Sequence, residues 1–198
     1  FVAAGLATQG MMWSTAPSPT EIENTVLDWL VDLLGLPSTW RIDTGPGGGV
    51  LQMSASDSTH LSLAIARHHA VEAGHATDSL VAYGSEQAHS SIEKGARIAG
   101  YRHIRSIQVD ESFALDVNAL EDQVEADLAS GLVPTWVCSA VGTTSTTAMD
   151  PIRPIAAVAK GHGMWHHADA AYAGSAMICP EFRKLQDGVE LVDSYTFN

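Results

Sequence analysis

The sequence predicts an α/β fold in which a mainly parallel sheet carries helices on both faces. Short apolar runs of strand length alternate along the chain with longer segments whose apolar residues repeat at helical spacing. The connections between the runs are long enough to hold a helix, as neighbouring parallel strands require. The expected strands are 79–83, 104–109, 135–141, 164–168 and 191–197, and the expected helices between them are 92–99, 117–128 and 151–160.

Composition places the chain among globular proteins and excludes several classes of partner. Its 198 residues are 45% apolar and 17% charged. No apolar run approaches the roughly 20 residues of a transmembrane helix. The net charge of −13 comes without any basic cluster, so we expect no nucleic-acid and no membrane partner. Cys138 and Cys179 are too few for a disulfide framework and lack metal-site spacing, so we expect no metal and a reducing, cytoplasmic setting.

The first helix is expected to begin at Thr20, after a turn-rich stretch over residues 1–19. Thr20 and Glu23 have the spacing of a capping box, and Gly35 followed by Pro37 ends the helix. One face is expected to be buried, either as scaffold or as a subunit contact. Its residues are Ile22, Val26, Trp29, Leu30, Leu33 and Leu34.

A phosphate site is predicted where the glycines at 47–49 and the Ser-Ala-Ser of 54–56 lead into a helix. The free amides and the positive dipole end of a helix N-terminus attract an anion, and the hydroxyls of Ser54 and Ser56 add donors. The alternative is that Ser56 or Asp57 is only an N-cap. No Gly-Lys-Ser/Thr sequence occurs, so the stretch is not a nucleotide P-loop. The buried face of the helix is expected to contain Leu61, Ala64 and Ile65, with His68 as a further candidate.

Polar residues follow the expected strands at one edge of the sheet. His89 lies between the strand at 79–83 and the next helix, and Thr144 lies in a hydroxyl-rich loop after the strand at 135–141. The carboxyl ends of parallel strands share an edge, where open α/β folds bind ligands. A lone histidine is usually a solvated side chain, but its position distinguishes His89 from the others.

The stretch from Trp165 to Ser175 is the most informative in the chain. The strand at 164–168 is expected to deliver Asp169 to the sheet edge, and the small residues Ala170, Ala171, Ala173 and Gly174 follow it. Small residues let a flat group approach the backbone, and a lone carboxylate suits a cationic heteroaromatic ring. The alternative is a tight turn that Asp169 caps.

Together these features favour pyridoxal phosphate as the cofactor. Its phosphate suits a helix N-terminus, its ring suits an imidazole on one face and a small side chain on the other, and its pyridine nitrogen needs an ionised carboxylate. The motifs resemble those of the group II pyridoxal-phosphate decarboxylases, and most closely the aromatic-L-amino-acid branch with its tyrosine, tryptophan and histidine enzymes. The similarity extends over residues 10–198 and rests on the segments 47–56, 86–91, 142–144, 169–175 and 178–183.

The resemblance implies roles around the cofactor ring. Asp169 would pair with the pyridine nitrogen, and Thr144 would form a hydrogen bond near it. His89 would stack on one face of the ring, where it can assist protonation, and Ala171 would lie against the other. His89 and Asp169 are therefore the expected catalytic residues.

The resemblance also implies phosphate and substrate contacts. Ala55, Ser56 and Asn198 would hold the phosphate. Met11 would line the substrate pocket of a partner subunit in a homodimer, at a position where an aromatic residue is often found. Its neighbours Gln9 and Met12 could equally be core or interface residues.

The implied protein is a fold-type I enzyme that decarboxylates an aromatic L-amino acid to its amine and carbon dioxide. We expect residues 1–19 to lie near the dimer interface and residues 20–198 to form the cofactor-binding large domain, truncated at its C-terminal end. The family attaches its cofactor to the Lys of a Pro-His-Lys segment that directly follows the Asn matching Asn198, so we expect this sequence to be a fragment that ends just before that Lys. The remaining lysines, Lys94, Lys160 and Lys184, match no family motif.

Other functions stay open. Another pyridoxal-phosphate reaction on the same scaffold, such as transamination or oxidative conversion to an aldehyde, depends largely on loop residues outside this sequence. A non-catalytic protein could keep the fold as an interaction module. A dinucleotide-binding domain is disfavoured, because no Gly-x-Gly-x-x-Gly follows a first strand.

Overall fold

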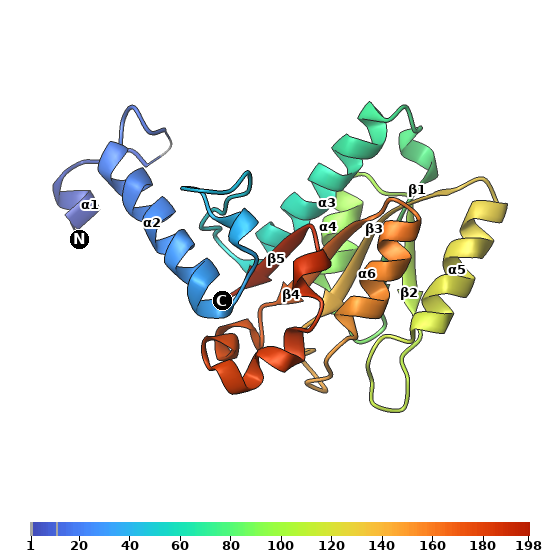
Figure 1. Ribbon diagram of the computed structural model, residues 1–198. Helices are drawn as coiled ribbons and strands as arrows, with labels where there is room; N and C mark the ends of the chain where they lie inside the picture. The colour runs from blue at the N-terminus through green and yellow to red at the C-terminus, as the bar shows by residue number, and fades with distance from the viewer. Residues whose placement is uncertain (1, 11) are drawn as a thin grey trace. The chain divides into compact units, whose positions relative to one another are not determined.

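The computed structural model describes residues 2–10 and 12–198, and contacts divide the chain into two compact units. One unit extends to Leu51, and the other comprises Gln52–Asn198 (Figure 1). The position near a dimer interface expected for residues 1–19 stays a prediction.

The larger unit is built on a five-stranded sheet in which all neighbouring strands are parallel. Its strands are β1 (Leu80–Ser85), β2 (His103–Ile107), β3 (Val133–Ala140), β4 (Trp165–Ala170) and β5 (Ser194–Phe197), in the spatial order β2-β1-β3-β4-β5. The chain moves outward from β1 to β2 and then crosses back to β3 on the other side of β1. The switch point of the topology therefore lies between β1 and β3, where such folds bind ligands.

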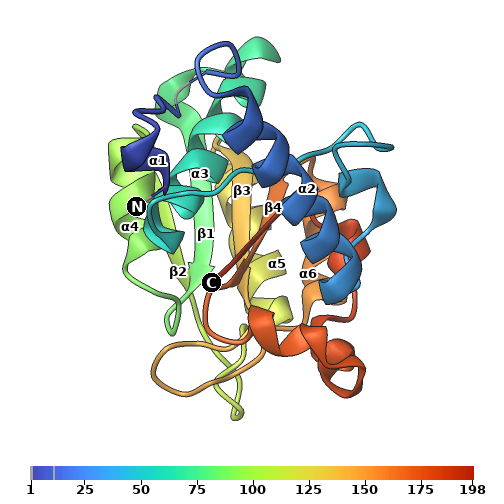
Figure 2. The same cartoon turned by 90° about the vertical axis from the view of Figure 1, so that its left-hand side faces the viewer.

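Helices cover both faces of this sheet (Figure 2). One face carries α3 (Ala55–Glu72) and α4 (Ser91–Ile98), and the other carries α5 (Val117–Ala129) and α6 (Ile152–Gly161). Three 3₁₀ helices, Gly174–Ile178, Pro180–Gln186 and Val189–Leu191, connect β4 to β5. The predicted α/β class, with a parallel sheet between two helical layers, is confirmed.

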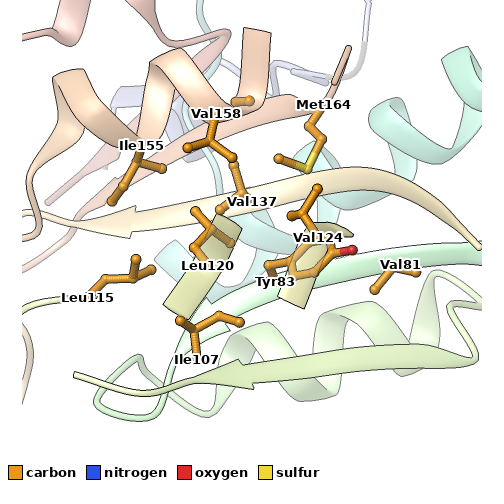
Figure 3. Packing of buried hydrophobic residues seen from close by; sticks show 11 residues of the cluster. Val81, Tyr83, Ile107, Leu115, Leu120, Val124, Val137, Ile155, Val158 and Met164 are labelled. Carbon is orange, nitrogen blue, oxygen red and sulfur yellow. The ribbon is translucent and has the colours of Figure 1, made fainter. Parts of the chain in front are cut away.

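Alternating strand residues build a separate core on each face of the sheet. Tyr83 of β1 and Val137 of β3 pack against α5 and α6 (Figure 3). Ala82 of β1 and Trp136 of β3 pack on the opposite face, against α3 and α4. The Trp136 side chain is fully buried, and its indole Nε1 donates to Ser62 Oγ of α3 at 3.1 Å. Burial of each large apolar side chain contributes roughly 1.5–3 kcal/mol, so the sheet is held firmly from both sides.

The end of β4 differs from the expectation. Asp169 is a residue of the strand rather than the residue after it, because β4 continues to Ala170. It pairs with Ala140 of β3 on one side and with Thr196 of β5 on the other. The backbone of Asp169 is thus fixed by two neighbouring strands.

The expected buried face of α3 is wrong. Leu61 is 41% exposed, Ala64 is exposed, Ile65 is half-buried and His68 is exposed. The buried residues are Thr59, Ser62, Leu63 and Ala66. Three of these four residues are small or bear hydroxyls, and the indole of Trp136 takes Ser62 as its hydrogen-bond partner, so apolar periodicity pointed to the wrong face.

In the smaller unit, the predicted capping box is wrong. The helices are α1 (Val2–Gly5) and α2 (Pro17–Leu34), followed by a 3₁₀ helix at Ser38–Trp40. The N-cap of α2 is Ala16, and no side chain caps it. Pro17 lacks an N–H and fits the first position of a helix, so α2 begins before Thr20. The Thr20 hydroxyl donates to Ala16 O at 3.0 Å, and the Glu23 carboxylate accepts from Leu51 N at 2.8 Å.

The apolar face expected on α2 is only partly buried. Ile22, Trp29 and Leu33 are 62%, 61% and 48% exposed, so these three residues are not scaffold within this chain, and a subunit contact through them stays a prediction. The residues that α2 does bury are Asp28, Val31 and Leu34.

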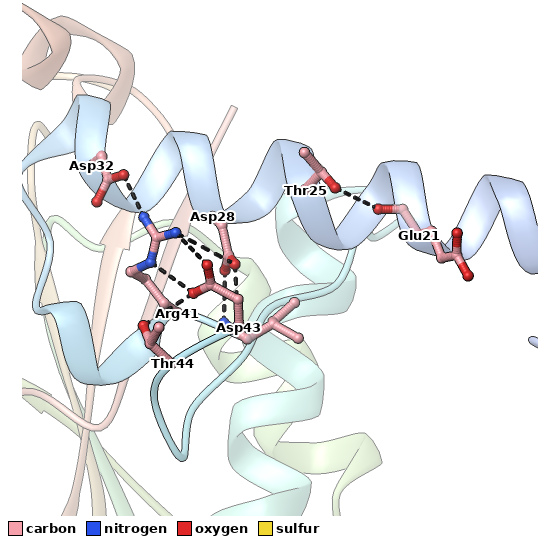
Figure 4. A network of polar contacts seen from close by, with 8 residues as sticks. Glu21, Thr25, Asp28, Asp32, Arg41, Asp43 and Thr44 are labelled. Carbon is pink, nitrogen blue, oxygen red and sulfur yellow. Dashed lines mark hydrogen bonds and ion pairs between the residues drawn. The ribbon is translucent and has the colours of Figure 1, made fainter.

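Asp28 belongs to a polar network that holds the segment after α2 (Figure 4). Its carboxylate accepts from the amides of Ile42 and Asp43 at 2.6 and 3.1 Å. The Arg41 guanidinium forms two hydrogen bonds to Asp43, at 2.8 and 2.7 Å, and a further one to Asp32. Arg41 lowers the pKa of Asp43 to about 2. The network therefore fixes the turn that precedes the glycine-rich segment.

Candidate functional site

A pocket of about 280 Å³ lies at the carboxyl edge of the sheet, at the switch point between β1 and β3. Its walls come from strand ends, from the loops that follow them and from the N-terminus of α3. The residues that line it are Ser54, Ala55, Ser56, His89, Ser91, Ala140, Gly142, Thr143, Thr144, Asp169, Ala171, Tyr172 and Asn198. Its size is close to the roughly 300 Å³ at which small-molecule pockets begin.

The pocket brings together every predicted cofactor residue. Ala55, Ser56, His89, Thr144, Asp169, Ala171 and Asn198 all line it, although they are distant from one another in the sequence. Met11, predicted to contact the substrate of a partner subunit, lies outside the described residues. The individual roles assigned from the resemblance stay predictions.

The N-terminus of α3 forms one end of the pocket. Ser54 is the N-cap, and its Oγ accepts from Asp57 N at 3.2 Å, so the alternative that Ser56 or Asp57 is the cap is wrong. Ala55 and Ser56 occupy the first turn, where backbone amides have no partner within the helix. With 18 residues behind it, this turn carries the partial positive charge of a long helix. The arrangement can bind an anion.

Asp169 supplies the carboxylate of the pocket. Its Oδ1 accepts from Ala171 N at 3.1 Å, as the turn interpretation expected, but no described residue donates a hydrogen bond to Oδ2. Burial raises the pKa of Asp169, while the Ala171 amide and His89 act in the opposite direction. A bound cation would favour the ionised form and offset the effect of burial. Asp169 therefore has one oxygen used by the fold and one available to a ligand.

His89 lies in the turn between β1 and α4, and its side chain is exposed at the pocket. Its Nδ1 lies 2.9 Å from Ser91 Oγ and accepts from Ser91 N at 3.2 Å. A backbone N–H can only donate, so Nδ1 carries the lone pair and the neutral ring carries its proton on Nε2. The neutral imidazole therefore has an N–H to offer to a ligand.

The loop after β3 shapes a second wall. Gly142 has a φ of 88°, and a Cβ there would lie 2.7 Å from Cδ1 of Tyr172, so only glycine fits. The Thr143 hydroxyl is used within the loop, where it lies 2.6 Å from Thr146 Oγ1 and accepts from Ala148 N at 3.1 Å. Thr144, in contrast, is exposed, so its hydroxyl can reach a ligand.

The small residues near Asp169 were predicted to let a ligand approach, but some of them pack against β5 instead. Only Ala171 among them lines the pocket. Gly174 packs on β5 instead, because a Cβ there would lie 2.5 Å from Cβ of Phe197. The Ser175 hydroxyl donates to the backbone oxygen of Asn198. Ala170 and Gly174 therefore hold the end of β5 close to β4, whereas Ala173 donates its backbone N–H to Val141 O after β3.

Several important residues had no role assigned from the sequence. Ser91, Ala140 and Tyr172 line the pocket, although Ser91 and Tyr172 stand inside the motifs that were recognised. Below the pocket, β4 carries the buried residues His166 and His167. Burial lowers their pKa values to about 4 and about 3. Their place in the middle of a buried strand is the sequence feature that could have identified them.

The two histidines have separate partners. His166 Nε2 lies 2.9 Å from Ser139 Oγ, and His167 Nδ1 lies 2.8 Å from Ser194 Oγ. The His167 ring stacks on Trp136 with centroids 5.8 Å apart. Among the described residues, no group of three or more His, Cys, Asp or Glu is placed to hold a metal ion, and no helix is both long and apolar enough to cross a membrane.

Comparison with known proteins identifies the family. The pyridoxal-dependent decarboxylase conserved domain matches residues 1–198. The chain belongs to this family. Phenylacetaldehyde synthase of Arabidopsis thaliana is 43% identical over 204 residues, which cover 100% of this chain and 41% of the relative. Tyrosine decarboxylase 2 of the same plant is 43% identical over 201 residues, which cover 98% of this chain and 37% of the relative.

Solved structures agree with this family. The crystal structure of Oryza sativa TDC with PLP and tryptamine matches with a TM-score of 0.96 and 41% sequence identity, over 100% of this chain and 42% of that chain. The predicted resemblance to the aromatic amino-acid branch of the decarboxylases is confirmed. The chain spans about two fifths of the length of the curated relatives it matches.

Proposed function

We propose that this chain forms the pyridoxal phosphate site of an enzyme that decarboxylates an aromatic L-amino acid to its amine and carbon dioxide. The observation that carries the proposal is the pocket in which all seven predicted cofactor residues meet. Tyrosine decarboxylase 2 and Tryptophan decarboxylase TDC2, at 43% and 44% identity, support the substrate class. The Oryza sativa structure with PLP supports the cofactor.

The donor set of the pocket fits this cofactor. The first turn of α3 and the exposed Ser56 hydroxyl suit a phosphate ester. The free Oδ2 of Asp169 suits a protonated ring nitrogen, and this carboxylate has no cationic side chain within its hydrogen-bonding shell among the described residues. When bound, pyridoxal phosphate supplies an electron sink for the electrons left behind as carbon dioxide departs.

The residues of this chain have distinct tasks in the proposed reaction. The ionised carboxylate of Asp169 would hold a proton on the ring nitrogen, which would keep the ring electron-poor. His89 would lie against the ring and offer its Nε2–H, and the small side chain of Ala171 would leave room for the ring. Thr144 would donate a hydrogen bond near Asp169, and Asn198 would help to hold the phosphate.

A second candidate function is oxidative conversion of the same substrates to aldehydes, in which dioxygen accepts two electrons and the substrate loses carbon dioxide and ammonia. Phenylacetaldehyde synthase and 4-hydroxyphenylacetaldehyde synthase are 43% and 42% identical to this chain, the same level as the decarboxylases. Both reactions release carbon dioxide, so the product that keeps the side chain distinguishes them.

The test is a product assay on the full-length protein with added pyridoxal phosphate. L-tyrosine, L-tryptophan, L-phenylalanine and L-histidine are supplied singly, with L-glutamate as the control, and carbon dioxide, amine, aldehyde and keto acid are quantified in one reaction. We expect amine and carbon dioxide in equal amounts from at least one aromatic substrate and no product from glutamate. Aldehyde in place of amine would favour the second candidate, and keto acid without carbon dioxide would contradict both.

We also propose that the protein is a homodimer in a reducing, cytoplasmic setting. The exposed apolar residues Ile22, Trp29 and Leu33 of α2 support a subunit contact in the smaller unit. Free Cys138 and Cys179 support the reducing setting. The mass of the full-length protein in solution, measured by light scattering, checks the dimer, and localisation of a tagged copy checks the compartment.

A further inference from the structure

Asp150, at the end of the loop that follows β3, has both carboxylate oxygens bound by the backbone of other segments. It is 3% exposed. Its Oδ2 accepts from Ala140 N at 2.7 Å, and its Oδ1 accepts from Leu115 N at 2.8 Å. Its own backbone N donates to Ala140 O at 2.9 Å. Asp150 therefore holds both polar backbone groups of Ala140 and also anchors the loop that contains Leu115.

The residue that Asp150 holds belongs to the pocket. Ala140 lines the pocket and is the partner of Asp169 in the register of β3 and β4. The next residue, Val141, donates its backbone N–H to Asp169 O at 2.8 Å. Any shift of β3 at Ala140 would therefore move the backbone of Asp169 with it.

Asp150 also closes the loop that carries Thr144. Val141 and Met149 form an antiparallel bridge at the base of this loop, and Thr143 N donates to Ala148 O at 3.0 Å. Thr147 has a φ of 60°, a conformation that a β-branched residue adopts only at a cost in free energy. A loop with this strain needs a fixed base, and Asp150 provides it.

A role in stability alone is the competing explanation. An apolar residue at position 150 would leave the buried amides of Leu115 and Ala140 without partners, so the carboxyl group stabilises the fold whatever its role in the pocket. Burial, together with the nearby carboxylate of Asp110, raises the pKa of Asp150 to about 6, although the two amides act in the opposite direction. A purely structural role would change the unfolding free energy but not the cofactor affinity of the folded protein.

We propose that Asp150 is a positioning residue for the cofactor pocket, which fixes the end of β3 against Asp169 and the Gly142–Thr147 loop against the ligand. The inference rests on the proposed function only in naming pyridoxal phosphate as that ligand. Asp150 does not line the pocket and acts through Ala140 and the loop.

The test compares Asp150→Asn with Asp116→Asn in the full-length protein. Asn keeps the size of Asp but has a single acceptor oxygen, so its NH₂ group would face one of the two amides. Asp116 is the matched control, because its carboxylate also accepts two backbone N–H groups, from Asn118 and Ala119, at the N-cap of α5. Asn is an equally good N-cap, so this control should behave as the wild type.

Two measurements are made under conditions where near-ultraviolet circular dichroism shows each variant to be folded. Titration with pyridoxal phosphate, followed by absorbance, should give an affinity about tenfold weaker for Asp150→Asn, as expected for the loss of about one buried hydrogen bond. Hydrogen exchange should be faster in residues 140–150 of this variant, with and without cofactor. Wild-type affinity in folded Asp150→Asn would overturn the inference, whether or not exchange in residues 140–150 is faster.

Two further outcomes are separable. If Asp150→Asn does not fold, Thr143→Val tests the part of the claim that concerns the loop, because it removes the hydroxyl contacts inside the loop, although Thr143 itself also lines the pocket. Faster loop exchange with unchanged affinity in that variant would also overturn the inference. If the wild type itself binds no pyridoxal phosphate, the proposed function fails, while the exchange data still decide whether Asp150 fixes the pocket.

Discussion

Asp169, which is half-buried, and Asp150, which is buried, are two carboxylates at the same edge of one sheet, and the fold uses them differently. Both oxygens of Asp150 accept backbone amides, whereas Asp169 has only its Oδ1 bound, by the Ala171 amide. Asp169 lines the pocket and Asp150 does not. The comparison shows that Asp150, with both oxygens bound by the backbone, has none left for a ligand, whereas Asp169 keeps one oxygen available at the pocket.

The largest expected effect comes from Asp169→Asn. Asn keeps the contact with the Ala171 amide but has no negative charge, so it cannot hold a proton on the ring nitrogen. We expect kcat to fall by about 100-fold or more, in the range found when a single electrostatic contact in an active site is lost. The unfolding free energy should change by less than about 1 kcal/mol, since the fold uses only one oxygen of this side chain.

Carbon dioxide release and urea unfolding of the full-length protein check this prediction. The same substitution at Asp150 should give the reverse pattern, a large loss of stability with a smaller loss of turnover. Equal loss of stability in both variants would break the comparison, and normal turnover in Asp169→Asn would contradict the proposed function.

The two carboxylates also differ in how far the sequence could reveal them. Asp169 stands next to a recognisable strand and a run of small residues, so its place at the sheet edge followed from local pattern. Asp150 stands before Pro151 at the start of α6, where an aspartate is expected to be a helix cap. Its partners, Leu115 and Ala140, are 35 and 10 residues away, and contacts between distant segments leave no periodic pattern.

The same limit explains the errors in the fold. The strands of the sheet were predicted from short apolar runs, and the observed strands differ from the predicted ones only in where they begin and end, as β4 does. The start of α2 was wrong, because Pro17 begins the helix before the Thr20 that resembles a cap. The apolar residues Ile22 and Trp29 satisfied helical spacing but are exposed, because spacing cannot show which face of a helix finds a partner.

The next largest effect concerns how the unfolding free energy depends on pH. The buried histidines His166 and His167 and the buried Asp150 are expected to change it in opposite directions. Burial lowers the pKa values of His166 and His167 to about 4 and about 3, so their contribution to stability is present above about pH 6.5 and is lost on acidification. Burial raises the pKa of Asp150 from 3.8 to about 6, so its ionisation lowers stability as the pH rises through that interval. The two effects have opposite slopes between about pH 4 and 6.

Replacing the Asp150 carboxyl group tests this opposition between Asp150 and the two histidines. Asp150→Asn has no carboxyl group to titrate, so its unfolding free energy should fall more steeply than that of the wild type between pH 6 and 4. The difference between the two curves should reach at most about 3 kcal/mol, the equivalent of two pKa units. Urea unfolding at several pH values measures it, and parallel curves would show that Asp150 does not titrate in this range.

The smallest expected effect comes from two serines, Ser54 and Ser56, which differ in the same way as the two aspartates. Ser54 Oγ caps α3 and accepts from Asp57 N, whereas the Ser56 side chain is exposed at the pocket. Ser54→Ala should therefore cost about 1 kcal/mol of unfolding free energy, as the loss of an N-cap does. Ser56→Ala should change stability by less than about 0.5 kcal/mol and weaken pyridoxal phosphate binding several-fold, because an exposed hydroxyl is free for the phosphate. The opposite result would be a larger loss of cofactor affinity in Ser54→Ala than in Ser56→Ala, with unchanged stability. The Ser54 hydroxyl would then contact the phosphate although it already caps α3, and the hydrogen bonds made within the fold would not distinguish structural from ligand-binding hydroxyls.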